Sequence, residues 1–203
     1  MVRLILLLFL GISVQVSLAK NIYESDFSDV QAPNLPEHWH PTFGSTEGDL
    51  DSIFQSNTEE GQGGCLEIVV NSSQVSSDTA HWWSLAILIL DTEILEEDLA
   101  KYRLSLSLKA NKDAEVTIKL VALDQEKQEQ GVIEFKKPVD SGWRDFDLVL
   151  EEGTRRGDFG LKAEQYTLVV SMTREGFEQD QGKESHLYID DVKFERKAQG
   201  TYN

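Results

Sequence analysis

Two adjacent aspartates near the end of the chain are placed to bind a hard cation. Asp190 and Asp191 interrupt an alternating apolar pattern, in which the apolar positions are odd before them and even after them (Leu187 and Ile189, then Val192 and Phe194). Such a change of phase within a strand predicts a β-bulge. A bulge that carries carboxylates can direct an oxygen ligand toward Ca²⁺.

A second group of oxygen ligands lies near the start of the chain, where Glu24 and Asp26 flank Ser25. The first and last strands of a closed sandwich often pair, so the two segments can meet. We therefore expect Glu24, Asp26, Asp190 and Asp191 to bind a structural Ca²⁺. The alternative is a solvated bulge with an N-terminal cap and no metal.

The adjacent pair Trp82 and Trp83 is the most informative local feature of the sequence. It directly precedes the continuously apolar segment Leu85–Leu90, which predicts a strand covered on both faces. Neighbouring residues on a strand point to opposite faces. One of the two rings can therefore join the core, and the other cannot easily do so.

Catalytic motifs are absent from the sequence. It contains no Gly-x-Ser-x-Gly elbow, P-loop, His-Glu-x-x-His or dinucleotide fingerprint. Acidic residues are frequent enough that a carboxylate pair for glycoside hydrolysis stays open as an alternative. The tandem pairs, such as Glu151–Glu152, would face opposite sides of a strand, so we expect no enzyme.

The elements that must position these residues are strands. Apolar residues alternate with polar ones in four segments, at 101–109, 115–123, 143–150 and 165–172. Each such strand has one apolar side and needs a facing layer. We therefore predict an all-β fold, a sandwich of two antiparallel sheets with nine or ten strands. Only Ile94–Ala100 hints at a helix.

Composition excludes several classes of partner. The 203 residues include 36 acidic and 19 basic side chains, for a formal net charge of −17. This charge argues against nucleic acid and against anionic lipid as partners. The single cysteine, Cys65, rules out an internal disulfide and a Cys-rich zinc site. It lies in a predicted strand, so we expect a buried and inert thiol.

The first 19 residues have the pattern of a secretory signal peptide. Arg3 precedes an apolar run, and Ser17 and Ala19 supply small residues before Lys20. The run is short for a membrane anchor. We expect cleavage after residue 19, a secreted (extracellular or periplasmic) protein with no membrane partner, and a single domain over residues 20–203. The oligomeric state stays open.

Five segments together resemble the carbohydrate-binding modules of the galactose-binding-like β-jelly-roll type, especially families 4, 9 and 22. The resembling segments are Tyr23–Phe27 with Trp39, Gly63–Ile68, Tyr102–Leu106, Gly142–Phe146 and Leu187–Val192. They occur over most of residues 20–203, and the closing Tyr-Ile-Asp-Asp-Val is the most specific of them. The resemblance implies a jelly roll whose concave sheet face binds sugar without catalysis.

Sugar rings stack on aromatic side chains, while acids and amides bond their hydroxyl groups. The resemblance therefore implies Trp82 or Trp83 as the stacking platform, followed by Trp39 and Tyr188. We assign Trp143, which follows a turn, to core or edge packing.

Two other functions stay open at this point. One is a protein- or matrix-interaction module of the same fold, which would present a broad apolar patch. The other is a jelly-roll glycan hydrolase or lyase, which for hydrolysis would place two convergent acids in a cleft.

Overall fold

The computed structural model describes residues 19–44, 52–58, 63–71, 82–89, 96–159, 165–173 and 184–197, together with Glu60, Ile94 and Ala163. The predicted signal peptide lies outside these residues, apart from Ala19. The described part forms twelve strands: β1 (Lys20–Ser25), β2 (Trp39–Gly44), β3 (Ser52–Asn57), β4 (Cys65–Asn71), β5 (Trp82–Ile89), β6 (Tyr102–Ala110), β7 (Ala114–Leu123), β8 (Glu129–Val139), β9 (Arg144–Val149), β10 (Thr154–Gly157), β11 (Gln165–Thr173) and β12 (Glu184–Arg196).

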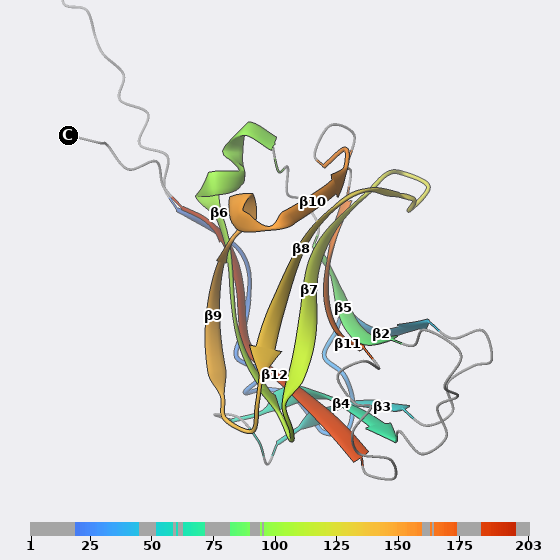
Figure 1. The fold of residues 1–203 in the computed structure, drawn as a ribbon. Coiled ribbons are helices and arrows are strands. Elements are labelled where there is room, and N and C mark those ends of the chain that lie inside the picture. The colour runs from blue at the N-terminus through green and yellow to red at the C-terminus, as the bar shows by residue number, and fades with distance from the viewer. Residues whose placement is uncertain are drawn as a thin grey trace, which may run out of the picture.

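The strands form two antiparallel sheets of six strands each. Sheet A has the order β3-β4-β12-β6-β9, with β1 also paired to β12, and sheet B has the order β10-β8-β7-β11-β5-β2. In Figure 1, β9, β6 and β12 lie on one side of the molecule, and β8, β7 and β11 face them from the other. The predicted all-β, two-sheet antiparallel sandwich is confirmed.

The core lies between the two sheets and follows the predicted alternation. On β6, Leu104, Leu106 and Leu108 are buried, and on β11, Leu168 and Val170 are buried from the opposite sheet. Burial of these side chains is the main favourable term in folding, at about 25 cal/mol per Å² of apolar surface. The strand that holds Leu85, Ala86 and Ile87 is covered on both faces, as predicted.

The strand count and the helix differ from the prediction. The described residues contain twelve strands instead of nine or ten, because short strands such as β10 carry too few residues for a clear alternation. The helical segment is a 3₁₀ helix, η2 (Glu96–Lys101), and a single 3₁₀ turn, η3 (Leu150–Glu152), follows β9. No helix of the described residues is long and apolar enough to cross a membrane.

The predicted bulge and the pairing of the chain ends are both present. The register between β12 and β6 shifts between Asp190 and Lys193. Asp191 has a left-handed backbone, with φ of 49°. The strand β1 pairs with the second half of β12, so that Ser25 lies opposite Val192. The bulge divides β12 into one half that pairs with β4 and another that pairs with β1.

Candidate functional site

The four aromatic residues predicted as sugar platforms do not share one face. Trp39 and Trp83 are buried in the core, with 5% and 1% of their surface exposed. The Trp39 Nε1–H donates to the Tyr23 hydroxyl at 2.8 Å, and its ring meets the Phe27 ring edge-on at 5.8 Å. Neither ring has a free face for a ligand, so in this structure both are packing residues rather than platforms.

Trp82 is described by its backbone alone. It pairs with Thr173 on β11 and with Gly44 on β2, next to the core position Trp83. This placement agrees with the expectation that the pair divides between the two faces of a strand. The role of Trp82 as a platform stays a prediction.

Tyr188 lies on the outer face of sheet A, at the centre of the sheet. His186 and Tyr188 are two residues apart on β12, so they share one face, while Leu187 and Ile189 enter the core. Tyr188 is opposite Glu67 on β4 and opposite Lys109 on β6. An acid, an aromatic ring and a base therefore lie side by side on the outer face of β4, β12 and β6.

Aromatic rings form a continuous row on this face. The rings of His186 and Tyr188 are stacked, with centroids 6.0 Å apart and planes at 18°. Trp143, from the turn before β9, also packs against Tyr188, with ring centroids 6.4 Å apart and planes at 54°. Tyr188 itself is only 9% exposed, whereas Trp143 and His186 are half-buried. Trp143 and His186 therefore present the accessible ring surface.

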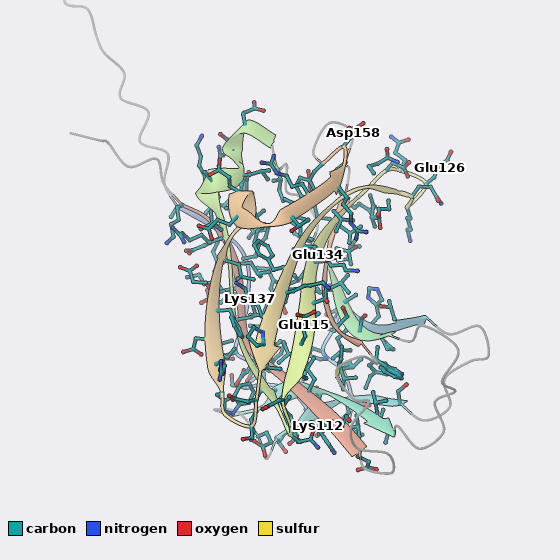
Figure 2. All side chains as sticks on the ribbon, viewed as in Figure 1. Lys112, Glu115, Glu126, Glu134, Lys137 and Asp158 are labelled. Atoms are coloured by element: carbon teal, nitrogen blue, oxygen red, sulfur yellow. The ribbon has the colours of Figure 1, made fainter. Side chains whose placement is uncertain are left out.

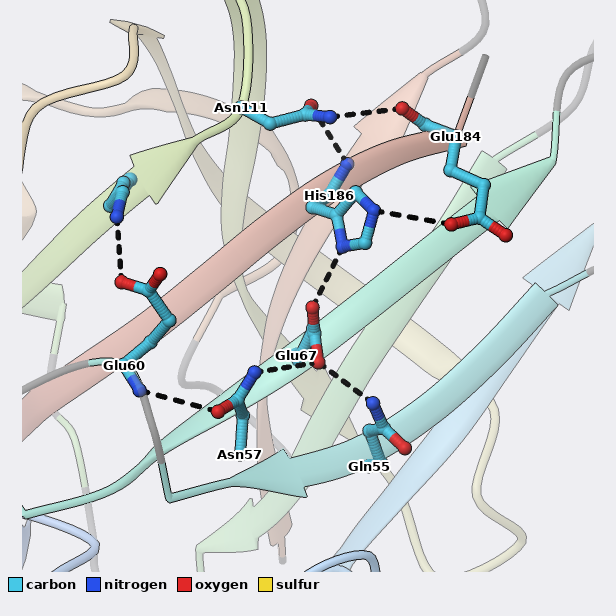
Figure 3. A network of polar contacts seen from close by, with 8 residues as sticks. Gln55, Asn57, Glu60, Glu67, Asn111, Glu184 and His186 are labelled. Carbon is cyan, nitrogen blue, oxygen red and sulfur yellow. Dashed lines mark hydrogen bonds and ion pairs between the residues drawn. The ribbon is translucent and has the colours of Figure 1, made fainter. Parts of the chain in front are cut away.

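Polar side chains surround the row, and we call the whole set the Tyr188 face. Its members are Trp143, His186, Tyr188, Gln55, Asn57, Glu60, Glu67 and Lys109. Figure 3 shows that most of the polar members converge on the Glu67 carboxylate. One Glu67 oxygen accepts Gln55 Nε2 at 2.8 Å and Asn57 Nδ2 at 3.0 Å, and the other lies 2.8 Å from His186 Nδ1.

These hydrogen bonds decide the protonation of Glu67. Its 3% exposure alone would raise the pKa, but the hydrogen bonds from His186, Gln55 and Asn57 outweigh burial and leave the pKa below its ordinary value. An ionised carboxylate only accepts hydrogen bonds, so the His186 Nδ1 carries a hydrogen. A carboxyl that is held ionised is unsuited to act as a general acid, which needs a raised pKa.

A lysine lies over the ring of Tyr188. The Lys109 ammonium lies 5.3 Å from the centroid of the Tyr188 ring and 2.6 Å from a Glu60 oxygen. Glu60 belongs to the segment between β3 and β4, and its N–H donates to the Asn57 side chain at 3.2 Å. The ion pair thus joins this segment to β6 across the intervening strands. The pKa of Tyr188 is raised, chiefly by burial and further by the nearby Glu67 and Glu60 charges.

The predicted burial of Cys65 is confirmed. Its side chain is fully buried, and it forms no disulfide. Burial, and then the charges of Asp190, Glu67 and Glu60, raise the thiol pKa to about 12. The thiolate is the reactive form of cysteine, so the thiol is inert at neutral pH.

The four predicted calcium ligands are not gathered into one set. Asp26 Oδ1 accepts hydrogen bonds from the N–H and hydroxyl of Ser28, which lower its pKa. Asp190 is buried and accepts the Asp191 N–H, whereas Glu24 lies opposite Lys193. Among the described residues, no three His, Cys, Asp or Glu side chains lie close enough to share a metal ion. As placed, these side chains alone do not supply the six to eight oxygens that Ca²⁺ needs.

The outer face of sheet B has a different chemistry. Glu134 on β8 lies between Lys119 and Arg156, at 3.6 Å and 3.3 Å, and Lys136 lies 3.4 Å from Glu115. Glu115 and Glu134 are labelled in Figure 2 on this sheet. Among the side chains that the structure describes, this face carries no Trp, Tyr or Phe ring. Its part over β7, β8 and β10 is a surface of ion pairs.

Several members of the Tyr188 face were missed from sequence, namely Trp143, His186, Glu67 and Lys109. The spacing of His186 and Tyr188 was a usable signal, because residues two apart on a strand share a face. No signal within the sequence places Glu67 or Lys109 beside them, since this depends on strand order and register.

Comparison with known proteins shows the fold. No family model matches the chain, and no curated protein sequence matches it. Among solved structures, a family 11 carbohydrate-binding module of Clostridium thermocellum, in complex with a β-1,3-1,4-mixed-linked tetrasaccharide, is similar with a TM-score of 0.57 at 12% identity. The similarity covers 87% of this chain and 94% of that one.

Two further structures are similar. A family 30 carbohydrate-binding module of a cellulosomal cellulase of Clostridium thermocellum matches with a TM-score of 0.56 at 15% identity, over 92% of this chain and 99% of that one. An enzymatically active domain of a bacteriophage CBA120 tailspike protein matches with a TM-score of 0.51 at 11% identity, over 80% of this chain and 19% of that one. The chain therefore has the jelly-roll fold of carbohydrate-binding modules, with families 11 and 30 among its structural neighbours.

Proposed function

We propose that this protein is a non-catalytic carbohydrate-binding protein, and that the Tyr188 face is its binding site. One observation carries the proposal: a half-buried Trp143 continues the row of Tyr188 and His186, within a surround of amide, carboxylate and ammonium groups. Sugar sites combine these two parts, because the ring covers a C–H face while the polar groups bond hydroxyls.

The neighbours support this choice of ligand. The family 11 module named above was solved with a mixed-linked glucan tetrasaccharide. Charge supports an uncharged glycan, since the chain carries a net charge of −17 and would repel polyanions. We therefore propose a neutral polysaccharide as the ligand.

Isothermal titration with mixed-linked β-glucan oligosaccharides, combined with a neutral-glycan array, tests the proposal. We expect Trp143→Ala to weaken binding about tenfold, in line with the loss of one stacked aromatic contact. Trp82→Ala tests the competing prediction of a stacking platform on sheet B, and with the site on the Tyr188 face this variant should bind as well as the wild type. Weakened binding by Trp82→Ala, with unchanged binding by Trp143→Ala, would place the site on sheet B. Absence of binding to every neutral glycan would refute the proposed function.

The two alternatives have less support. Among the described residues, Ile53 is the one large apolar side chain that is exposed, which is not the broad patch expected for a protein partner. A hydrolase would need a general acid, and the lowered pKa of Glu67 makes it a poor one. Binding without catalysis therefore remains the better proposal.

We also propose secretion and a structural calcium ion, both from sequence. Cleavage before Lys20 should yield an exported protein whose N-terminal sequence begins Lys-Asn-Ile. Calcium would bind between Glu24 and Asp26 near the end of β1 and the bulge of Asp190 and Asp191, with main-chain oxygens completing the ligand set. The pairing of β1 with β12 places Ser25 opposite Val192, so the two predicted groups of calcium ligands lie on neighbouring strands.

A further inference from the structure

A cavity of about 360 Å³ lies within the loop that connects β1 and β2. The lining residues that the structure describes all come from the segment Ser25–Glu37, which it describes in full. It shares no residue with the Tyr188 face. Pockets of about 300 Å³ and above are large enough to enclose a small ligand.

The wall is held in place by contacts outside the segment. The buried Ser56 on β3 donates its N–H to Pro33 O at 3.2 Å and its hydroxyl to Asn34 O at 2.6 Å. Phe27 is buried against Trp39 at the base of the loop. The loop is therefore fixed before any ligand arrives, which lowers the entropic cost of binding.

The lining of the cavity has an apolar side and a polar side. Val30 and Leu35 are half-buried and pack against the core. The side chains of Asp29, Gln31 and Asn34 also line this open pocket; all three are exposed to solvent, and within the described part of the protein none of them makes a hydrogen bond. These groups differ from the carboxylate of Glu67, whose oxygens are already bonded within the protein.

The charge of the lining restricts the ligand. Asp26, Asp29 and Glu37 line the cavity, and its described lining residues include no lysine or arginine. Carboxylates accept hydrogen bonds from hydroxyl groups but repel an anionic ligand. Amide side chains both donate and accept, as the hydroxyls of a sugar do.

From this geometry we infer a second binding site, in which the β1–β2 cavity takes a single uncharged sugar residue through Asp29, Gln31 and Asn34. The ring lies against Val30 and Leu35, and its hydroxyl groups bond the three free side chains. This site does not depend on binding at the Tyr188 face.

The test is an NMR titration of the ¹⁵N-labelled protein in EDTA, with the methyl glycosides of glucose, galactose and mannose, and with glucuronate as an anionic probe. We expect at least one neutral glycoside to shift the amide signals of residues 25–37, with a dissociation constant of order 1 mM. Glucuronate should leave these signals unchanged.

Three variants make the result decisive. Asp29→Ala and Gln31→Ala should each weaken this binding roughly tenfold. Asp158→Asn, at an exposed acid far along the chain (Figure 2), and Trp143→Ala should not change it. Shifts confined to residues near Trp143, or none with any neutral glycoside, would overturn the second site. Oligosaccharide binding lost in Trp143→Ala would still stand as a separate result for the Tyr188 face.

Discussion

The Glu67 carboxylate and the His186 imidazole meet at 2.8 Å across the β4–β12 pair, although 119 residues separate them in the sequence. His186 is oriented further by its main-chain N–H, which donates to Asn111 Oδ1 at 3.0 Å. The contact fixes the ring that stacks on Tyr188. The acid thus orders the aromatic row.

Replacing Glu67 with Gln should destabilise the protein by about 1–3 kcal/mol at pH 7, because buried donors lose their charged partner. The pKa of Glu67 is lowered in the folded state, so its charge contributes stability that is complete above the unfolded pKa of about 4.3. That contribution is lost as the pH falls through the folded pKa. Urea unfolding should therefore show a difference between wild type and Glu67→Gln that shrinks on acidification. A difference independent of pH would contradict the ionised state.

Replacing Trp39 should lower mainly the stability of the fold, whereas replacing Trp143 should weaken mainly sugar binding. Trp39→Ala removes a core ring and the hydrogen bond to Tyr23, so it should cost about 3–5 kcal/mol of unfolding free energy. Trp143→Ala removes a half-buried ring outside the core and should cost about 1 kcal/mol or less. Thermal and urea unfolding of both variants measure this contrast. Equal losses would show that Trp143 is a packing residue.

Gly64 should not tolerate a side chain. A Cβ there would lie 2.6 Å from Phe27 O, and its φ of +150° is unfavourable for other residues. We expect Gly64→Ala to destabilise the protein by about 1–3 kcal/mol. Gly142→Ala is the matched control, since its Cβ would meet Asp140 Oδ1 at an ordinary 3.5 Å. Comparable melting temperatures for the two variants would refute the close packing of the β1–β2 loop on Gly64.

Cys65 should be unreactive in the folded protein. With its pKa raised to about 12 and its side chain fully buried, it should not react with a thiol reagent such as DTNB at pH 8. One thiol per chain should react once urea unfolds the protein. Fast reaction of the native protein would mean that the outer face of sheet A opens at this position.

Calcium should raise the melting temperature if the bulge binds it. A ligand that binds only the folded state stabilises by mass action, by about 2.7 kcal/mol at 100 times its dissociation constant. We expect Asp190→Asn to abolish the difference between CaCl₂ and EDTA, while Asp158→Asn retains it. An identical melting temperature in CaCl₂ and EDTA would exclude a structural calcium.

Prediction from sequence succeeded where the pattern is local. Alternation in β6, β7, β9 and β11, and the change of phase at Asp190, depend on neighbours within one strand. The expectation that Trp39 offers an accessible ring was wrong, because it depends on a contact that is not local. A tryptophan on a short strand and one after a turn look alike until the facing layer is known, and the structure buries Trp39 and leaves Trp143 half-buried.

The sequence by itself determined the longer alternating strands, the apolar faces that make them a two-sheet sandwich, the bulge and the buried thiol, because each follows from side-chain period, turn chemistry and composition. Only the tertiary structure decided that Glu67, Tyr188 and Lys109 lie side by side, because the order β4-β12-β6 and its register bring together residues that are distant along the chain. The same is true of the β1–β2 cavity, whose walls depend on hydrogen bonds from Ser56 on a different strand.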